Sequence, residues 1–346
     1  GDLWQALNPG LPDLPIIDLI VEENELVAGS HGRGFWVLDN LAPLREAMPG
    51  MTEKIMLFTP PVATRSAGGV TLSWWQPESD DDLRLEIVDG DGNVLRTFLP
   101  AGQDAEEVGP EGRYLSAPLP NEAGLNFVHW DLRTQPFEVF PGMIYWGVRT
   151  SAPAVPPGEY TVRLTSGGQA FNAPLNVQRN PWITDVTDED LQAQFDFGEM
   201  VRDKVTEANR EVIMVRNVKS QLTERMEHSN DSRLAEAGTR LTVEASEVEQ
   251  WIYQVLNEAG QDPLNFPIRV NNRLANLLSM SERGDGRPGN NMPVIFDILV
   301  EELSGYQQEI DEIWSIELTE VNRILGELGL PAIDPECDRP EGCMAT

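Results

Sequence analysis

Ser30, His31 and Arg33 are side chains of types suited to catalysis, and they lie among three glycines in "AGSHGRGFWVLDN" (residues 28–40). A glycine-rich loop binds phosphate when a helix follows it, because the amides at the helix N-terminus then face the anion. Here the strand pattern "FWVLD" follows instead. The chain also has no G-x-S-x-G turn that would expose a nucleophilic serine. We therefore interpret the stretch as a structural corner between strands.

A second candidate site is "DGDGN" (residues 89–93), whose oxygens have the first, third and fifth-position spacing of a calcium-binding loop. That loop also needs a glycine at its sixth position and a bidentate acid at its twelfth, where this chain has Val94 and Pro100. The spacing therefore predicts a hairpin turn. Zinc and haem sites have no support, because no metal-binding spacing relates the three histidines, His31, His129 and His228. The sequence thus predicts a protein that is not an enzyme, with no catalytic residue, metal or cofactor.

Aromatic residues gather in "FPGMIYWGVRT", where Phe140, Met143, Tyr145 and Trp146 lie in a proline- and glycine-rich context. Aromatic side chains dominate the energetics of protein interfaces, so these four are candidate partner-binding residues. The alternative is that they are strand and core residues of a β-domain, since aromatics bury large areas. Both interpretations stay open from the sequence.

The cysteines of the chain are Cys337 and Cys343, in "CDRPEGC". A disulfide between them would close a small loop and would suit an extracytoplasmic protein. The alternative is a pair of free thiols on a terminal tail. A mass increase of two hydrogens on reduction distinguishes the bridge from the thiols.

The charge balance restricts the partners. The chain has 57 acidic and 25 basic residues, a formal net charge of -32. This charge argues against binding to nucleic acid or to an anionic lipid surface, and it favours attraction to basic proteins. No run of about eighteen apolar residues is present, so the sequence predicts no membrane span. The start at Gly1, without Met or a signal-like segment, predicts a mature or trimmed terminus.

The elements that position these residues change in type along the chain. Residues 1–60 predict a β-meander, because "PIIDLIVEENELVAGS" sets two apolar runs around a polar turn and "GFWVLD" adds a third. Residues 61–178 contain hairpin patterns such as "DLRLEIVDGDGNVLRTF", and they predict an immunoglobulin-like β-sandwich with long loops.

Residues 179–330 have the three- and four-residue apolar spacing of helices and predict an antiparallel bundle of about four. Thr187 is an expected N-cap, and Gly260 with Pro263 is expected to end the second helix. Residues 331–346 are expected to form a tail that contains the cysteine pair. The expected fold class is therefore α+β and multidomain.

Several segments resemble the C-terminal third of large secreted bacterial proteins with sortilin-like, Asp-box propeller repeats, which are often labelled glycosyl hydrolases. The similar segments are residues 11–45, 125–133, 155–182, 271–278 and 287–299. In that family a stretch like HGRGFWVLD closes the last propeller blade. The resemblance therefore implies that residues 29–39 are a retained blade edge, and residues 1–60 a propeller-blade remnant.

The chain departs from this family because the propellers are absent and no S-x-D-x-G-x-T-W repeat occurs. No catalytic residue of the family maps onto this sequence. The resemblance instead implies a non-catalytic accessory or scaffolding subunit that binds other subunits of a periplasmic or extracellular assembly, a membrane-attached complex included. One setting that fits is the periplasmic face of a bacterial photosynthetic reaction-centre and light-harvesting complex, where basic cytochromes would meet an acidic surface.

Two alternatives belong to other classes. The chain could be the C-terminal fragment of a larger secreted hydrolase that contains propellers. It could also be a carbohydrate-binding module, if the aromatic rings of Tyr145 and Trp146 are exposed.

Overall fold

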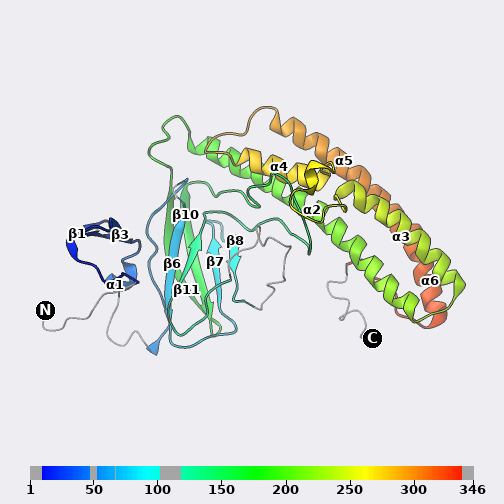
Figure 1. Ribbon diagram of the computed structural model, residues 1–346, viewed down its shortest axis with the longest axis horizontal. Helices are drawn as coiled ribbons and strands as arrows, with labels where there is room; N and C mark the ends of the chain where they lie inside the picture. Colours follow the sequence, from blue (N-terminus) through cyan, green and yellow to red (C-terminus); the bar gives the residue numbers. More distant parts are fainter. Residues whose placement is uncertain (1–9, 47–52, 67, 102–117, 337–346) are drawn as a thin grey trace. The chain divides into compact units, whose positions relative to one another are not determined.

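The computed structural model describes residues 10–46, 53–66, 68–101 and 118–336 (Figure 1). It contains both helices and sheets, which confirms the α+β class. The chain divides into two compact units. The first holds the described residues up to 132 together with 157–182, and the second holds 133–156 and 183–336.

The first unit begins with an antiparallel meander in the order β1-β2-β3. Its strands are β1 (Ile16–Glu22), β2 (Glu25–Ser30) and β3 (Phe35–Leu38), and the short helix α1 (Ala42–Glu46) follows. Asn24 donates a hydrogen bond to Asn40, whose own amide donates to Ser73 (3.0 and 3.1 Å). The buried Asn40 thus links the β1–β2 turn to strand β6 of the same unit.

Two further sheets make up the rest of this unit. One has the order β5-β11-β10-β7-β8, and the other has the order β4-β6-β9. All neighbouring strands are antiparallel except β11 and β5, which are parallel. The strands are β4 (Met56–Leu57), β5 (Ala63–Thr64), β6 (Val70–Gln76), β7 (Arg84–Val88), β8 (Val94–Phe98), β9 (Gly124–Trp130), β10 (Gly158–Ser166) and β11 (Gln169–Gln178).

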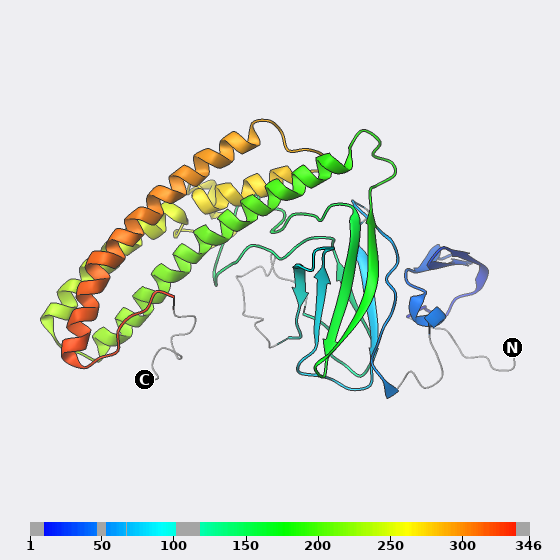
Figure 2. The same ribbon diagram turned by 180° about the vertical axis from the view of Figure 1, so that it is seen from behind.

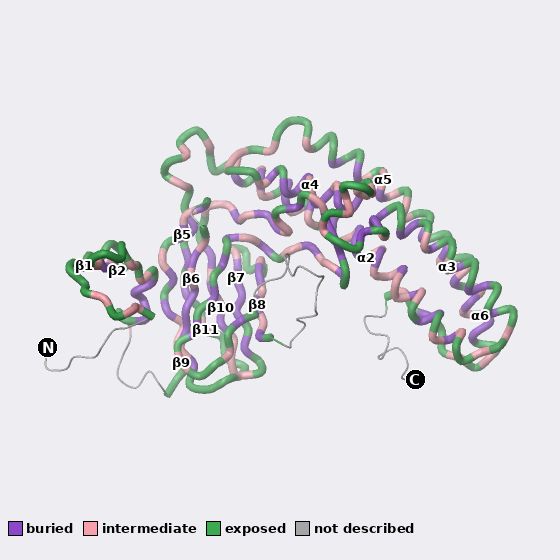
Figure 3. Tube along the Cα trace, in the orientation of Figure 1, coloured by how far each residue is buried: buried purple, intermediate pink, exposed green. Residues whose placement is uncertain are grey.

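The two sheets share a core. Along β9 exposed and buried residues alternate, as expected for a strand with one covered face. Trp130 on β9 meets the ring of Tyr160 on β10 edge-on, with ring centroids 6.2 Å apart. The largest buried side chains come from both sheets and include Trp74, Leu72, Leu85, Ile87 and Leu164 (Figure 3).

The "DGDGN" stretch is the turn between β7 and β8, as its spacing predicts. One carboxylate oxygen of Asp89 accepts the backbone N–H groups of Asp91 and Asn93, and the other accepts the Asn93 side chain. Partial burial opposes ionisation of Asp89, but these hydrogen bonds outweigh it and lower its pKa. Both carboxylate oxygens therefore serve the turn.

The described residues of the second unit contain five α-helices: α2 (Asp188–Glu227), α3 (Ser232–Ile252), α4 (Val270–Ser281), α5 (Met292–Ile313) and α6 (Thr319–Leu328). A 3-10 turn η2 (Asp262–Leu264) precedes α4, and one π-helical turn η3 (Trp314–Leu318) joins α5 to α6. Helix α2 packs against α3 and α4, and α3 packs against α5 and α6 (Figure 2). The apolar faces of these helices form a single core.

Of the two helix ends predicted from the sequence, one is correct and the other is wrong. Thr187 caps α2 as expected, in a reciprocal capping box with Asp190. The predicted end of the second helix near Gly260 is wrong, because α3 ends at Ile252 and Tyr253 is extended. The Tyr253 ring packs edge-on against Phe140, with centroids 4.9 Å apart, and this contact replaces another helical turn.

Residues 133–156 belong with the helices, whereas the sequence boundary at 178 grouped them with the β-sandwich. Asn272 on α4 accepts the backbone N–H of Trp146 and donates to its carbonyl (2.8 and 3.0 Å). The buried Glu282 carboxylate pairs with Arg133 at 2.7 Å and accepts the N–H of Ala154. Side chains on α4 and at its C-cap thus add to the few backbone hydrogen bonds within the segment, such as those from Thr134 to Pro153 and from Phe137 to Ser151.

We predict that Asn209→Ala destabilises the helical unit. Fully buried on α2, Asn209 accepts hydrogen bonds from Tyr145 and Asn271 and donates to the carbonyl of Glu138. Removing its amide breaks these three buried hydrogen bonds and should lower the free energy of unfolding by about 2–4 kcal/mol. Urea denaturation followed by circular dichroism measures this, with the exposed Gln250→Ala as the control. Equal midpoints for the two variants would contradict the prediction.

Alkaline pH should also destabilise the first unit, through Tyr160. Burial raises the pKa of Tyr160 from 10.0 to about 12. The unfolded chain therefore loses this proton first, so the stabilisation is complete below pH 10 and is lost as pH rises from 10 to 12. Denaturation of the wild type and of Tyr160→Phe across this range tests the expectation. The wild type should lose stability more steeply, and parallel curves would exclude the assignment.

Candidate interaction surface

The meander β1–β3 exposes apolar side chains on both of its faces. All seven residues of β1 are exposed, among them Ile17 at 70% and Leu19 at 59%. The pairing register places Ile20, Val27 and Val37 on one face. It places Leu19, Ala28 and Trp36 on the other face. A β-sheet normally has one apolar face, or two apolar faces that other elements cover. The exposed apolar residues on both faces of the meander are therefore unusual.

An apolar groove lies on the Leu19 face of the meander. Its volume is about 290 Å³. Its lining includes Leu11, Leu19, Leu26, Ala28, Trp36 and Leu38. The indole Nε1 of Trp36 is buried there and donates to no acceptor among the described residues. The side chains that line the groove are therefore mainly apolar.

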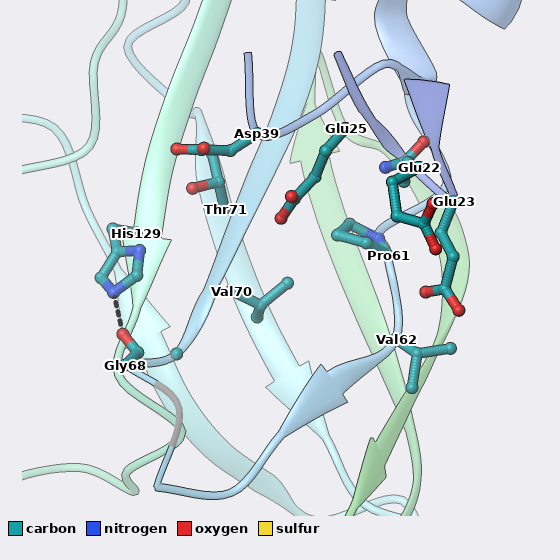
Figure 4. A pocket seen from close by; sticks show the side chains of 12 residues that line it. Glu22, Glu23, Glu25, Asp39, Pro61, Val62, Gly68, Val70, Thr71 and His129 are labelled. Atoms are coloured by element: carbon teal, nitrogen blue, oxygen red, sulfur yellow. Dashed lines mark hydrogen bonds between the residues drawn. The ribbon is translucent and has the colours of Figure 1, made fainter. Parts of the chain in front are cut away.

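An acidic cavity of about 650 Å³ adjoins the β1–β2 turn. Glu22, Glu23 and Glu25 line it from the turn, and Asp39 lines it from the end of β3 (Figure 4). His129 on β9 lies on the opposite side, with Nε2 2.6 Å from the carbonyl oxygen of Gly68. Four carboxylates and neither lysine nor arginine are among the residues that line it, so the cavity attracts positive charge.

The wall of this cavity depends on Gly69. Its φ is +100°, and a Cβ there would lie 2.3 Å from the carbonyl oxygen of Trp130. Only glycine allows this close approach of the backbone.

Within the described ranges no group of three His, Cys, Asp or Glu residues could hold a metal ion, so the cavity offers charge without a coordination site.

The opening stretch is a strand corner, as the sequence predicts. The hydroxyl and the N–H of Ser30 both donate to the Gly34 carbonyl, at 2.7 and 3.0 Å. The N–H of His31 donates to the Pro15 carbonyl. Because the corner uses the Ser30 hydroxyl, and the His31 and Arg33 side chains are exposed, we assign no site to these residues.

The aromatic cluster does not lie where either interpretation of the sequence placed it, at a partner interface or in the core of a β-domain. Phe140, Met143 and Tyr145 are buried, at 1%, 6% and 7% exposure, in the core of the helical unit. Trp146 is half-buried. The first three side chains thus present no surface to a partner, and they are core residues of the helical unit instead of the β-domain. Cys337 and Cys343 lie outside the described residues.

Sequence reasoning did not single out the apolar residues of β1 as a candidate interaction surface. Its signal is the composition of "IIDLIVE", in which five of seven residues are apolar and the apolar residues fall on both faces. A strand with only one covered face would alternate. The pattern thus indicates a strand that needs cover on both sides, and the sequence does not show that the cover is missing.

No protein-family model, curated protein or solved structure matches the chain. Among the described helices, none combines the length and the apolar character needed to cross a membrane.

Replacing exposed apolar residues of the meander should cost little stability. Ile20 and Val37 are 56% and 50% exposed, so Ile20→Ser with Val37→Ser should change the free energy of unfolding by less than about 1 kcal/mol. The same variant should bind less of a hydrophobic fluorescent dye. Val162→Ser is the control, because Val162 is fully buried and its loss should cost more than about 2 kcal/mol. Equal destabilisation would show that the meander face is covered.

Proposed function

We propose that the protein is a non-catalytic accessory or scaffolding subunit that binds other proteins in a periplasmic or extracellular assembly. The observation that carries this proposal is the exposed apolar meander β1–β3. Soluble monomers rarely leave contiguous apolar surface or a flat apolar edge strand in water, because both promote association. The residues of such a surface become buried when a partner subunit binds.

The charge of the chain specifies the partners further. A net charge of -32 raises the association rate with basic proteins and disfavours acidic ones. Basic cytochromes would satisfy this condition. Together with the resemblance to the C-terminal part of propeller-repeat proteins, this supports a place on the periplasmic face of a bacterial photosynthetic reaction-centre and light-harvesting complex.

The finer description of the fold is part of the same proposal. We infer that the two facing sheets of the first unit are an immunoglobulin-like sandwich, supported by their antiparallel pairing and shared core. We infer that α2–α6 are an antiparallel helical bundle, supported by their common apolar core. The meander would then be a propeller-blade remnant, as the resemblance implies.

One alternative rests on the same observation. In a C-terminal fragment of a larger secreted hydrolase, upstream sequence of the same polypeptide would cover the meander. Comparing the intact mass of the native protein with the length of its reading frame separates the two proposals. The alternative of a carbohydrate-binding module rests on two aromatic rings, of which Tyr145 is buried and Trp146 half-buried, so we favour it less.

We predict that the protein isolated from its native envelope in mild detergent co-migrates on a gradient with a larger complex. An Ile20→Glu, Val37→Glu variant should leave that complex, because it places charge in the apolar interface. The control is Val294→Glu with Ile298→Glu, at residues of α5 with similar exposure. Migration of the wild type alone, or joined to upstream sequence, would overturn the proposal.

A further inference from the structure

The outer edge of β1 has backbone groups directed away from the sheet. In the order β1-β2-β3, β1 pairs with β2 and with no other strand of the described residues. The N–H of Leu19 donates to the side chain of Asp18 at 2.9 Å, so it points away from β2. Backbone direction alternates along an antiparallel strand, so Leu19 and Val21 present their N–H and C=O groups outward. Ile20 hydrogen-bonds toward β2.

This edge has few of the features that protect edge strands. Such strands are usually short, or they carry prolines, lysines or bulges that prevent pairing. β1 is seven residues long, has no proline and is irregular only near Ile16. Its protection is the Asp18 carboxylate on the Leu19 N–H, and this side chain is exposed and free to rotate away. An added strand can therefore pair at Leu19 and Val21.

The surrounding charge selects the kind of strand. Residues 10–46 contain seven acidic and two basic residues. At the end of β1, the carboxylates of Glu22, Glu23 and Glu25 line the acidic cavity together with Asp39. A second copy of the chain would bring the same negative charge to this edge and is repelled. A strand that ends in lysine or arginine is attracted there.

We propose that β1 binds an extended segment of another protein by strand addition. The segment contributes apolar side chains along β1 and lysine or arginine residues at the end that lies beside Glu22. Its backbone pairs with Leu19 and Val21, and its basic side chains enter the acidic cavity. This inference rests on the proposed function and gives the chemistry of the partner at that same surface.

Binding of a designed peptide to the full chain tests the proposal. The probe is a fluorescent peptide of alternating valine and threonine followed by two lysines, and its binding is measured by fluorescence anisotropy. Two matched peptides serve as controls, one N-methylated at alternate residues and one with glutamate in place of lysine. We expect both controls to bind at least about tenfold more weakly, since one cannot pair its backbone and the other is repelled. Equal binding of the N-methylated peptide would overturn strand addition.

Variants of β1 give a second readout. Val21→Pro removes one outward N–H and leaves the bonds of Ile20 with β2 in place, whereas Val21→Thr keeps the N–H. We expect Val21→Pro to weaken peptide binding about tenfold and Val21→Thr to leave it unchanged. Unchanged binding by Val21→Pro would overturn the proposal. If this variant does not fold, the N-methylated peptide on the wild-type protein decides the question.

The remaining outcomes separate this inference from the proposed function. A concentration-dependent dimer that Val21→Pro abolishes would identify a second copy as the occupant and overturn the inference. Co-migration of Val21→Pro with the native complex would show that the partner binds elsewhere, so the inference fails and the proposed function stands. If the wild type binds the peptide and yet migrates alone from its envelope, the proposed function fails and strand addition at β1 stands.

Discussion

The structure of this protein depends on one constraint, which is that the apolar face of each layer must be covered by a second layer. In the first unit the five-stranded sheet and the sheet β4-β6-β9 cover each other, and Trp130 and Tyr160 meet in the core between them. In the second unit the helices cover one another and also bury apolar side chains of residues 133–156, among them Phe137, Phe140 and Val148. The meander β1–β3 meets the constraint only in part, because β1 remains exposed along its whole length. The proposed function follows from this difference.

Buried polar side chains determine how the second unit satisfies the same constraint. Residues 133–156 have little regular structure, and such a segment can be buried only if other groups satisfy its backbone. Asn209 and Asn272 do this from α2 and α4. Arg216 adds a charged contact, because its guanidinium lies over the ring of Phe140 and pairs with the buried Glu249. Specific hydrogen bonds, together with the burial of its apolar residues, therefore determine the position of this segment.

Local chemistry was predictable from the sequence, and long-range contact was not. Thr187 and the Asp89 turn were assigned correctly because each depends on residues within five positions. The location of Phe140 was not predictable, because its partner Tyr253 is more than a hundred residues away. For the same reason the end of α3 was misplaced. Strand patterns predicted that β1 exists, but they do not show what covers it, so the candidate surface emerged only from the three-dimensional structure.

The path of the chain between the units has a practical consequence. The polypeptide leaves the first unit after residue 132, returns at 157 and leaves again after 182. A single cut after residue 182 therefore removes most of the helical unit but leaves residues 133–156 behind, without the asparagines and the glutamate that hold them. Neither unit can be excised intact by proteolysis at one bond. Although each unit has a core of its own, the two units are encoded, expressed and degraded together as one polypeptide.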